Sequence, residues 1–146
     1  MWKPVLVIAA AVMVMALFGC GGGGKGAATT PEGTAQAFLA AVQAGDAMGV
    51  AVLYDYVEDA KRQNENWDDI PKGQQGLILK EEAKRNASSL EASLTAMKST
   101  YQEAKVGTAQ VNGETATVTV ETAQGSQTIK LVQRGDRWYL AGGVVE

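Results

Sequence analysis

The last third of the chain carries the pattern that most restricts its fold. Apolar side chains and threonines alternate from Ala116 to Val120, as in a strand with one buried face. Asn112-Gly113, directly before this run, is a strong hairpin signal. Gln124-Gly125 and Gly135-Asp136 predict two further turns. We therefore expect four antiparallel strands connected as a meander, with one apolar face and one threonine-rich face.

The residues before this sheet are predicted to begin with two helices. Thr30 followed by Pro31 is a typical helix start, because threonine caps free backbone amides and proline suits the first helical position. Gly45 ends this helix, and Asp46 is placed to cap a second one at about 47–56. Helices followed by a meander predict an α+β domain whose sheet folds over its helices.

A third, long helix is predicted from about Gln75, because apolar side chains recur at spacings of three and four as far as Tyr101. On its polar face Glu81 precedes Arg85 by four residues, the favourable order for an ion pair. The apolar stripe is short for a coiled-coil seam and contains alanines, so packing on the domain's own sheet is favoured. The polar residues 59–76 before this helix are predicted to form a loop.

The first twenty residues have the layout of an export signal. Lys3 precedes an apolar run, Val5–Phe18, that is shorter than the roughly 20 residues of a membrane-spanning helix. Leu17-Phe18-Gly19-Cys20 resembles the lipobox of bacterial lipoproteins. This resemblance implies cleavage before Cys20, acyl chains such as palmitate on that cysteine, and attachment to the extracytoplasmic face of a bacterial cell membrane, inner or outer. A plain secretory signal and an uncleaved anchor are the alternatives.

These features divide the chain into three parts. Residues 1–19 are predicted to be the lipoprotein signal peptide, 20–29 the lipidated cysteine with a glycine-rich tether, and 30–146 a single α+β domain. The tether is expected to bury nothing and to be flexible. Its glycines do not fit a phosphate-binding loop, because no strand precedes them and Lys25 is not followed by serine or threonine.

Composition excludes several kinds of site. The chain has no histidine, which removes the commonest general base and the commonest metal ligand. Its one cysteine is Cys20, so lipidation would leave no thiolate for catalysis or metal binding. Asp68-Asp69 is only a pair and lacks the spacing of a calcium loop. We expect no cofactor and no metal. The 13 basic and 16 acidic side chains also give no support for nucleic-acid binding.

Both ends of the predicted domain resemble one superfamily. Residues 30–46, with the sequence TPEGTAQAFLAAVQAGD, are similar to the start of nuclear-transport-factor-two-like, cystatin-like proteins, and Thr128–Leu140 is similar to their last hairpin. Within that superfamily the chain resembles small bacterial lipoproteins of undefined function. The resemblance implies a curved sheet that wraps a long helix into a cone. Such cones are closed in scaffold proteins and hollow in isomerases, dehydratases and small-ligand binders.

Two functions fit these observations. The favoured one is a non-catalytic, membrane-tethered domain that binds an envelope protein or a small hydrophobic ligand. The alternative is an isomerase, dehydratase or hydrolase acting in the cone, with an aspartate base and a tyrosine donor. No constellation of catalytic residues is visible, which favours the first.

Aromatic side chains are the candidate binding residues. Tyr54, Tyr56 and Trp67 are predicted to line a pocket or to contact a partner. Trp67 lies among polar residues, where it would be a lid, a partner contact, or a ring packed back onto the domain. Tyr101 and Trp138 are expected to fill the core.

Overall fold

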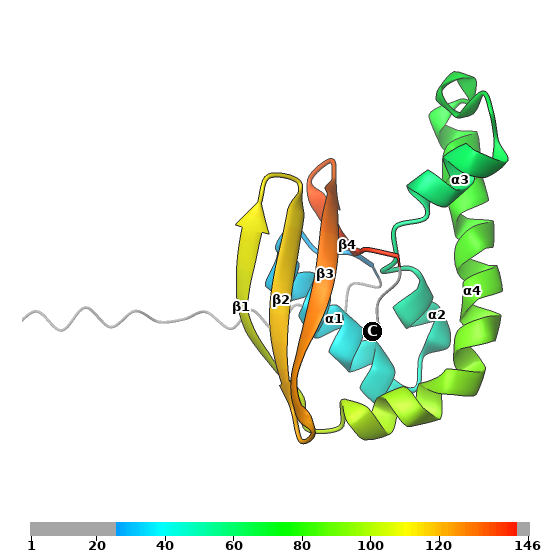
Figure 1. Cartoon of the computed structure of the whole chain (residues 1–146). Coiled ribbons are helices and arrows are strands. Elements are labelled where there is room, and N and C mark those ends of the chain that lie inside the picture. Colours follow the sequence, from blue (N-terminus) through cyan, green and yellow to red (C-terminus); the bar gives the residue numbers. More distant parts are fainter. Residues whose placement is uncertain (1–25, 143–146) are drawn as a thin grey trace, which may run out of the picture.

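Helices occupy the first part of the chain and strands the last, as the sequence predicts (Figure 1). The structure is a computed structural model and describes residues 26–142. Its elements are α1 (Pro31–Ala44), α2 (Ala47–Ala51), α3 (Val57–Gln63), the 3-10 helix η1 (Trp67–Asp69), α4 (Lys72–Thr100), β1 (Lys105–Asn112), β2 (Thr115–Thr122), β3 (Gly125–Arg134) and β4 (Arg137–Leu140). The predicted signal peptide and Cys20 lie outside the described residues. No described helix combines the length and apolar character that crossing a membrane requires.

Capping residues mark the ends of the first two helices. Thr30 Oγ1 accepts a hydrogen bond from the Gly33 amide at 3.1 Å, which satisfies a free amide at the start of α1. Gly45 ends α1 with a φ of 69°, a conformation that favours glycine. Asp46 Oδ1 accepts from the Gly49 amide at 2.8 Å at the start of α2. All three predicted caps are confirmed.

The predicted second helix is too long, because the chain leaves α2 to pair with the sheet. The Leu140 amide donates to the Leu53 carbonyl at 2.7 Å, and the Asp55 amide donates to the Leu140 carbonyl at 2.9 Å. These bonds require extended backbone, so the helix cannot continue to residue 56. The pairing depends on β4, which lies far along the chain, and local sequence does not reveal it.

The predicted loop at 59–76 is also corrected. Residues within it form most of α3, all of η1 and the first turn of α4, which begins at Lys72 rather than Gln75. In α3 only Ala60 is buried, so no apolar stripe announces this helix in the sequence. The helix has acidic side chains in its first turn and basic side chains in its last turn, and this arrangement of charge stabilises the helix dipole.

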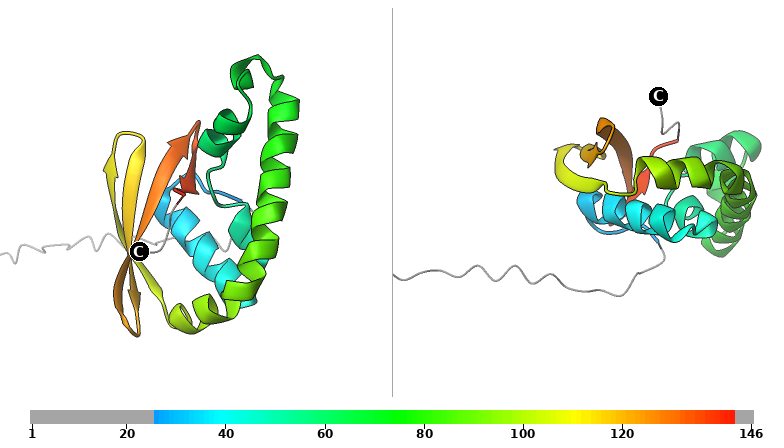
Figure 2. Two further views of the ribbon diagram at one scale, coloured as in Figure 1. Left: turned by 45° about the vertical axis from the view of Figure 1, so that its right-hand side comes forward. Right: turned by 90° about the horizontal axis from the view of Figure 1, so that it is seen from below.

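Four strands form one antiparallel sheet in the order β1-β2-β3-β4, as predicted. Val118 lies opposite Ile129, and Leu131 lies opposite Leu140, so these side chains share the buried face. Each of the three predicted turns connects neighbouring strands and contains a glycine with positive φ. The predicted α+β fold class is confirmed, with an open, curved sheet beside the helices (Figure 2).

The core lies between this sheet and the helices. Phe38 of α1 is fully buried and packs edge-on against Tyr101, with ring centroids 5.4 Å apart. Trp138 is also buried, so both predicted core aromatics are confirmed. Every residue of the main apolar cluster lies between Ala35 and Leu140. Among the described residues, this apolar cluster therefore lies within the predicted domain.

The long helix α4 packs mainly on α2, which corrects the prediction that it packs on the sheet, whereas α1 contacts three of the four strands. Figure 1 shows α4 bent toward the sheet only near its C-terminal end. The predicted Glu81–Arg85 ion pair does not form. Lys84 Nζ lies 2.6 Å from Glu81 Oε1, and Arg85 pairs with Glu82. Both observed pairs span three residues. The Lys84–Glu81 pair is exposed, so its contribution to stability is small, whereas Glu82 is mostly buried.

Packing begins earlier in the chain than predicted. Ala27, assigned to the flexible tether, is buried, and its carbonyl accepts from Arg137 Nη1 at 2.6 Å. The Trp138 amide donates to the Ala28 carbonyl at 2.8 Å. These bonds cover part of the β4 edge, which would otherwise present unpaired backbone groups. The expectation that the whole tether buries nothing is therefore wrong at Ala27, and residues 21–26 remain as its predicted flexible part.

Candidate functional site

The candidate site is built around Tyr54, Asp55 and Tyr56, which we call the tyrosine segment. It connects α2 to α3, and a backbone bridge holds Tyr54 beside Leu140 of β4. The two tyrosine rings lie with centroids 6.4 Å apart, tilted by 42°. Sequence reasoning singled out both tyrosines, and the structure brings them together. Three clefts border this segment, and two of them are lined by both tyrosines.

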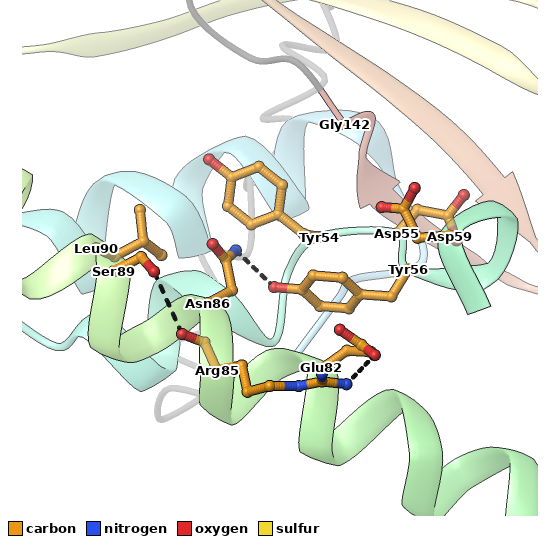
Figure 3. Close-up of a pocket in the computed structure, with 10 residues that line it drawn as sticks. All are labelled: Tyr54, Asp55, Tyr56, Asp59, Glu82, Arg85, Asn86, Ser89, Leu90 and Gly142. Carbon is orange, nitrogen blue, oxygen red and sulfur yellow. Dashed lines mark hydrogen bonds and ion pairs between the residues drawn. The ribbon is translucent and has the colours of Figure 1, made fainter. Parts of the chain in front are cut away.

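The first cleft, which we call the polar cleft, lies between the tyrosine segment and the middle of α4 and has a volume of about 450 Å³. Figure 3 shows the Tyr56 ring reaching toward Asn86 of α4. The Tyr56 hydroxyl donates to the Ala51 carbonyl at 2.7 Å and accepts from Asn86 Nδ2 at 2.8 Å. Glu82 and Arg85 form an ion pair on the α4 wall. The polar groups of this wall are therefore largely engaged with one another.

The second cleft, which we call the apolar cleft, has a volume of about 320 Å³. It shares the tyrosine segment with the polar cleft but reaches an earlier part of α4. Its apolar walls come from α3, α4, β4 and the residue that follows α2, and they are Val52, Val57, Leu79, Ala83 and Tyr139. The charged side chains that line it are Asp55, Lys80 and Arg134. Such a largely apolar hollow with few polar groups is typical of small-ligand sites.

Asp55 is tied to the end of β3 by an ion pair. Arg134 Nη2 lies 2.8 Å from Asp55 Oδ2 and 3.0 Å from Glu58 Oε1. The Asp55 side chain is only 8% exposed, so this carboxylate depends on Arg134 for compensation of its charge. The hydrogen bond from Arg134 to Asp55 raises the pKa of the guanidinium, which remains a cation. The site therefore contains a fixed pair of opposite charges beside the tyrosines.

Both phenols of the segment are held in their neutral form. Burial raises the pKa of Tyr56 to about 12, although the hydrogen bond from Asn86 acts in the opposite direction. Burial, with a smaller effect of Tyr101, also raises the pKa of Tyr54. Neither hydroxyl is prepared to act as a base or nucleophile near neutral pH, since both functions require the phenolate.

This burial predicts a loss of stability in alkaline solution. The ordinary pKa of a tyrosine side chain is 10.0, and the pKa of Tyr56 in the folded chain is about 12. The unfolded chain therefore ionises first, and the contribution of Tyr56 to stability is present below about pH 10 and lost as pH rises toward 12. Urea unfolding near pH 8 and near pH 11 should show a smaller drop in Tyr56→Phe than in the unaltered chain. Equal drops would contradict the described environment of this phenol.

Trp67 lies away from the clefts. It is 6% exposed and lines neither the polar nor the apolar cleft. Its carbonyl accepts from Gln75 Nε2 at 2.8 Å, which ties η1 to the start of α4. This burial agrees with a ring packed back onto the domain. Cys20, the predicted lipidation site, lies outside the described residues.

Sequence reasoning missed most of the charged and polar residues of the site. Asp55, Lys80, Asn86 and Arg134 come from three separate segments that only the fold brings together. On a helix or at a strand end, such side chains have the pattern of ordinary surface groups. The one local feature of the sequence that could have indicated a site residue was the position of Asp55 between two tyrosines. Among residues 26–142, no cluster of acidic or cysteine side chains is suited to hold a metal ion.

Comparisons with known proteins give little further information. No protein-family model and no curated protein matches the chain. Among solved structures, the chain is similar to a Campylobacter jejuni protein provisionally described as an NTF2-like transpeptidase, with a TM-score of 0.44 and 14% sequence identity. The match covers 77% of this chain and 97% of the other. A likeness this weak carries no argument about activity, and the fold assignment depends on the helices and sheet themselves.

Proposed function

We propose that the chain is a non-catalytic binding domain of the bacterial cell envelope, tethered to the membrane through lipid on Cys20. Its proposed ligand is a small molecule with an apolar body that binds beside the tyrosine segment. One observation carries this proposal. Two clefts that contain both tyrosines meet at Tyr54–Tyr56, while Asp55 and the Tyr56 hydroxyl are already engaged within the protein.

The engaged groups support binding rather than catalysis. An isomerase-like pair needs a carboxylate that is free to take a proton from substrate and a phenol that is free to donate to it. Asp55 is instead paired with Arg134, and the hydroxyl of Tyr56 both donates and accepts within the protein. The sequence contains no histidine that could replace them.

The start of the domain supports a short tether. Contacts of Ala27 and Ala28 with β4 leave residues 21–26 as the linker after the predicted lipidated cysteine. A linker of this length spans at most about 20 Å when fully extended. A lipidated chain would therefore keep its clefts close to the bilayer, where molecules with an apolar body concentrate.

Filling the apolar cleft tests the proposed function. Val57 lines this cleft and is partly exposed, so Val57→Trp adds bulk there without a change in the core. In calorimetric titration of residues 21–146 with decanol, we expect this variant to bind at least tenfold more weakly. Exclusion of two methylenes from an apolar site already costs about 1.6 kcal/mol.

A matched control places the same bulk outside the cleft. Leu77 is 64% exposed and does not line the apolar cleft, so Leu77→Trp should bind decanol as the unaltered chain does. Absence of decanol binding by the unaltered chain would contradict the proposal. An equal loss in both tryptophan variants would show that the apolar cleft is not the binding site.

A further inference from the structure

We infer that the apolar cleft accepts the hydrocarbon chain of an amphiphile with an anionic head group, and that Lys80 binds the head. This inference rests on the proposed function and adds the charge of the ligand.

The cleft is lined by one acidic and two basic side chains, Asp55, Lys80 and Arg134. Arg134 and Asp55 compensate each other at 2.8 Å, and the exposed Glu58 takes a further contact with the guanidinium. The positive charge left without a partner at the cleft is therefore that of Lys80. A cationic head group would meet this charge unfavourably, whereas an anionic one would complement it.

Lys80 differs from its neighbours on α4. Within the described part of the chain it forms no ion pair, whereas Lys84 pairs with Glu81 and Arg85 pairs with Glu82. Lys80 is exposed yet lines the cleft, which places it at the rim. A lysine has a flexible apolar stem and three rotatable donors, so it can cover a bound chain and still reach its head group.

The cleft is suited to a single hydrocarbon chain. Its volume of about 320 Å³ is near the lower end for ligand sites, which extend from about 300 to 1,000 Å³. The apolar side chains named above come from α3, α4, β4 and the residue after α2, and the charged groups lie on α4, on β3 and in the tyrosine segment. Apolar walls together with an exposed, unpaired lysine match a molecule with one tail and one anionic head, such as a fatty acid.

Three probes with the same hydrocarbon chain test the inference: decanoate, decanol and decyltrimethylammonium, each below its micelle concentration. The protein is residues 21–146, which include every core residue that the structure describes. We expect decanoate to bind about fivefold more tightly than decanol, because a partly exposed ion pair contributes up to about that factor. Decyltrimethylammonium should bind more weakly than decanol.

Substitution of the rim lysine separates its contribution from that of the cleft. Lys80→Gln should reduce decanoate binding to the level of decanol and leave decanol binding unchanged. Lys84→Gln is the matched control, since Lys84 is one turn further along α4, does not line the apolar cleft, and removes the same charge. Lys84→Gln should change the affinity for decanoate and for decanol by no more than the small effect of the altered net charge.

The outcomes distinguish this inference from the proposed function. Equal binding of decanoate and decanol, with no effect of Lys80→Gln, would overturn the anionic head group while leaving the apolar site intact. Preference for decyltrimethylammonium would also overturn it, and would assign the head group to the carboxylates of the polar cleft. Failure of all three probes to bind would contradict the proposed function itself.

Discussion

Replacement of residues 1–20 by a cleavable secretory signal that lacks cysteine is expected to move the protein from the membrane to the soluble fraction of the cell envelope. The native chain should stay with the membrane, because Cys20 would carry two or more acyl chains. One acyl chain holds a protein only marginally, whereas two hold it stably. Fractionation of the bacterial producer, followed by immunoblotting, measures the distribution.

Mass spectrometry of the membrane-bound form provides the second part of this test. Its mass should equal that of residues 20–146 plus the acyl groups, with the added mass located on Cys20. The variant Cys20→Ser alone is less informative, since an uncleaved signal would itself keep the precursor in the membrane. An unmodified Cys20 in native material, or soluble native protein, would contradict the tether.

Phe38→Ala should destabilise the domain by about 3–5 kcal/mol, the range found when a buried aromatic side chain is removed. Phe38 is fully buried under the sheet and touches the edge of Tyr101. The cavity would lie between α1 and the core, where rigid strands prevent collapse. Domains of this kind have about 5–15 kcal/mol of stability in total, so the loss is a large fraction of it.

Urea unfolding measures this effect through the midpoint of the transition, with an unchanged slope. Phe38→Leu retains most of the volume and should cost about 1.5 kcal/mol or less. Leu77→Ala removes a side chain that is 64% exposed and should change stability by no more than about 0.5 kcal/mol. A similar loss in Phe38→Ala and Leu77→Ala would contradict the described core.

Short-range patterns predicted those parts of the fold that neighbouring residues control. Thr30, Gly45 and Asp46 act within one helical turn, and all three cap as expected. The Asn112-Gly113 turn and the alternation after it determine the register of the first hairpin. Each of these caps and turns depends on backbone geometry within a few residues, so it can be predicted from the sequence.

Elements controlled by distant partners were predicted less well. The helix at α2 ends early because Leu53 and Asp55 pair with Leu140, more than 80 residues later. Ala27 is buried because the edge of β4 needs cover. In both cases the contact that determines the local structure comes from residues far away in the sequence. The need to pair backbone groups then outweighs the local secondary-structure propensity.

In the candidate site, too, some features could be predicted from the sequence and others depended on distant contacts. Tyr54 and Tyr56 could be named from the sequence because the predicted domain contains few aromatic side chains. That Arg134 would neutralise Asp55, and that Lys80 would stand unpaired at the rim of an apolar cleft, depended on where β3 and α4 lie relative to the tyrosine segment.

By itself, the sequence determined the α+β class, the meander and the turns, because repeating patterns and capping residues act over short distances. It also carries the lipobox-like segment on which the proposed tether depends. Only the tertiary structure decided which charges are compensated and which cleft remains open to a ligand. Those properties arise from distances between segments that the chain brings together only when it folds.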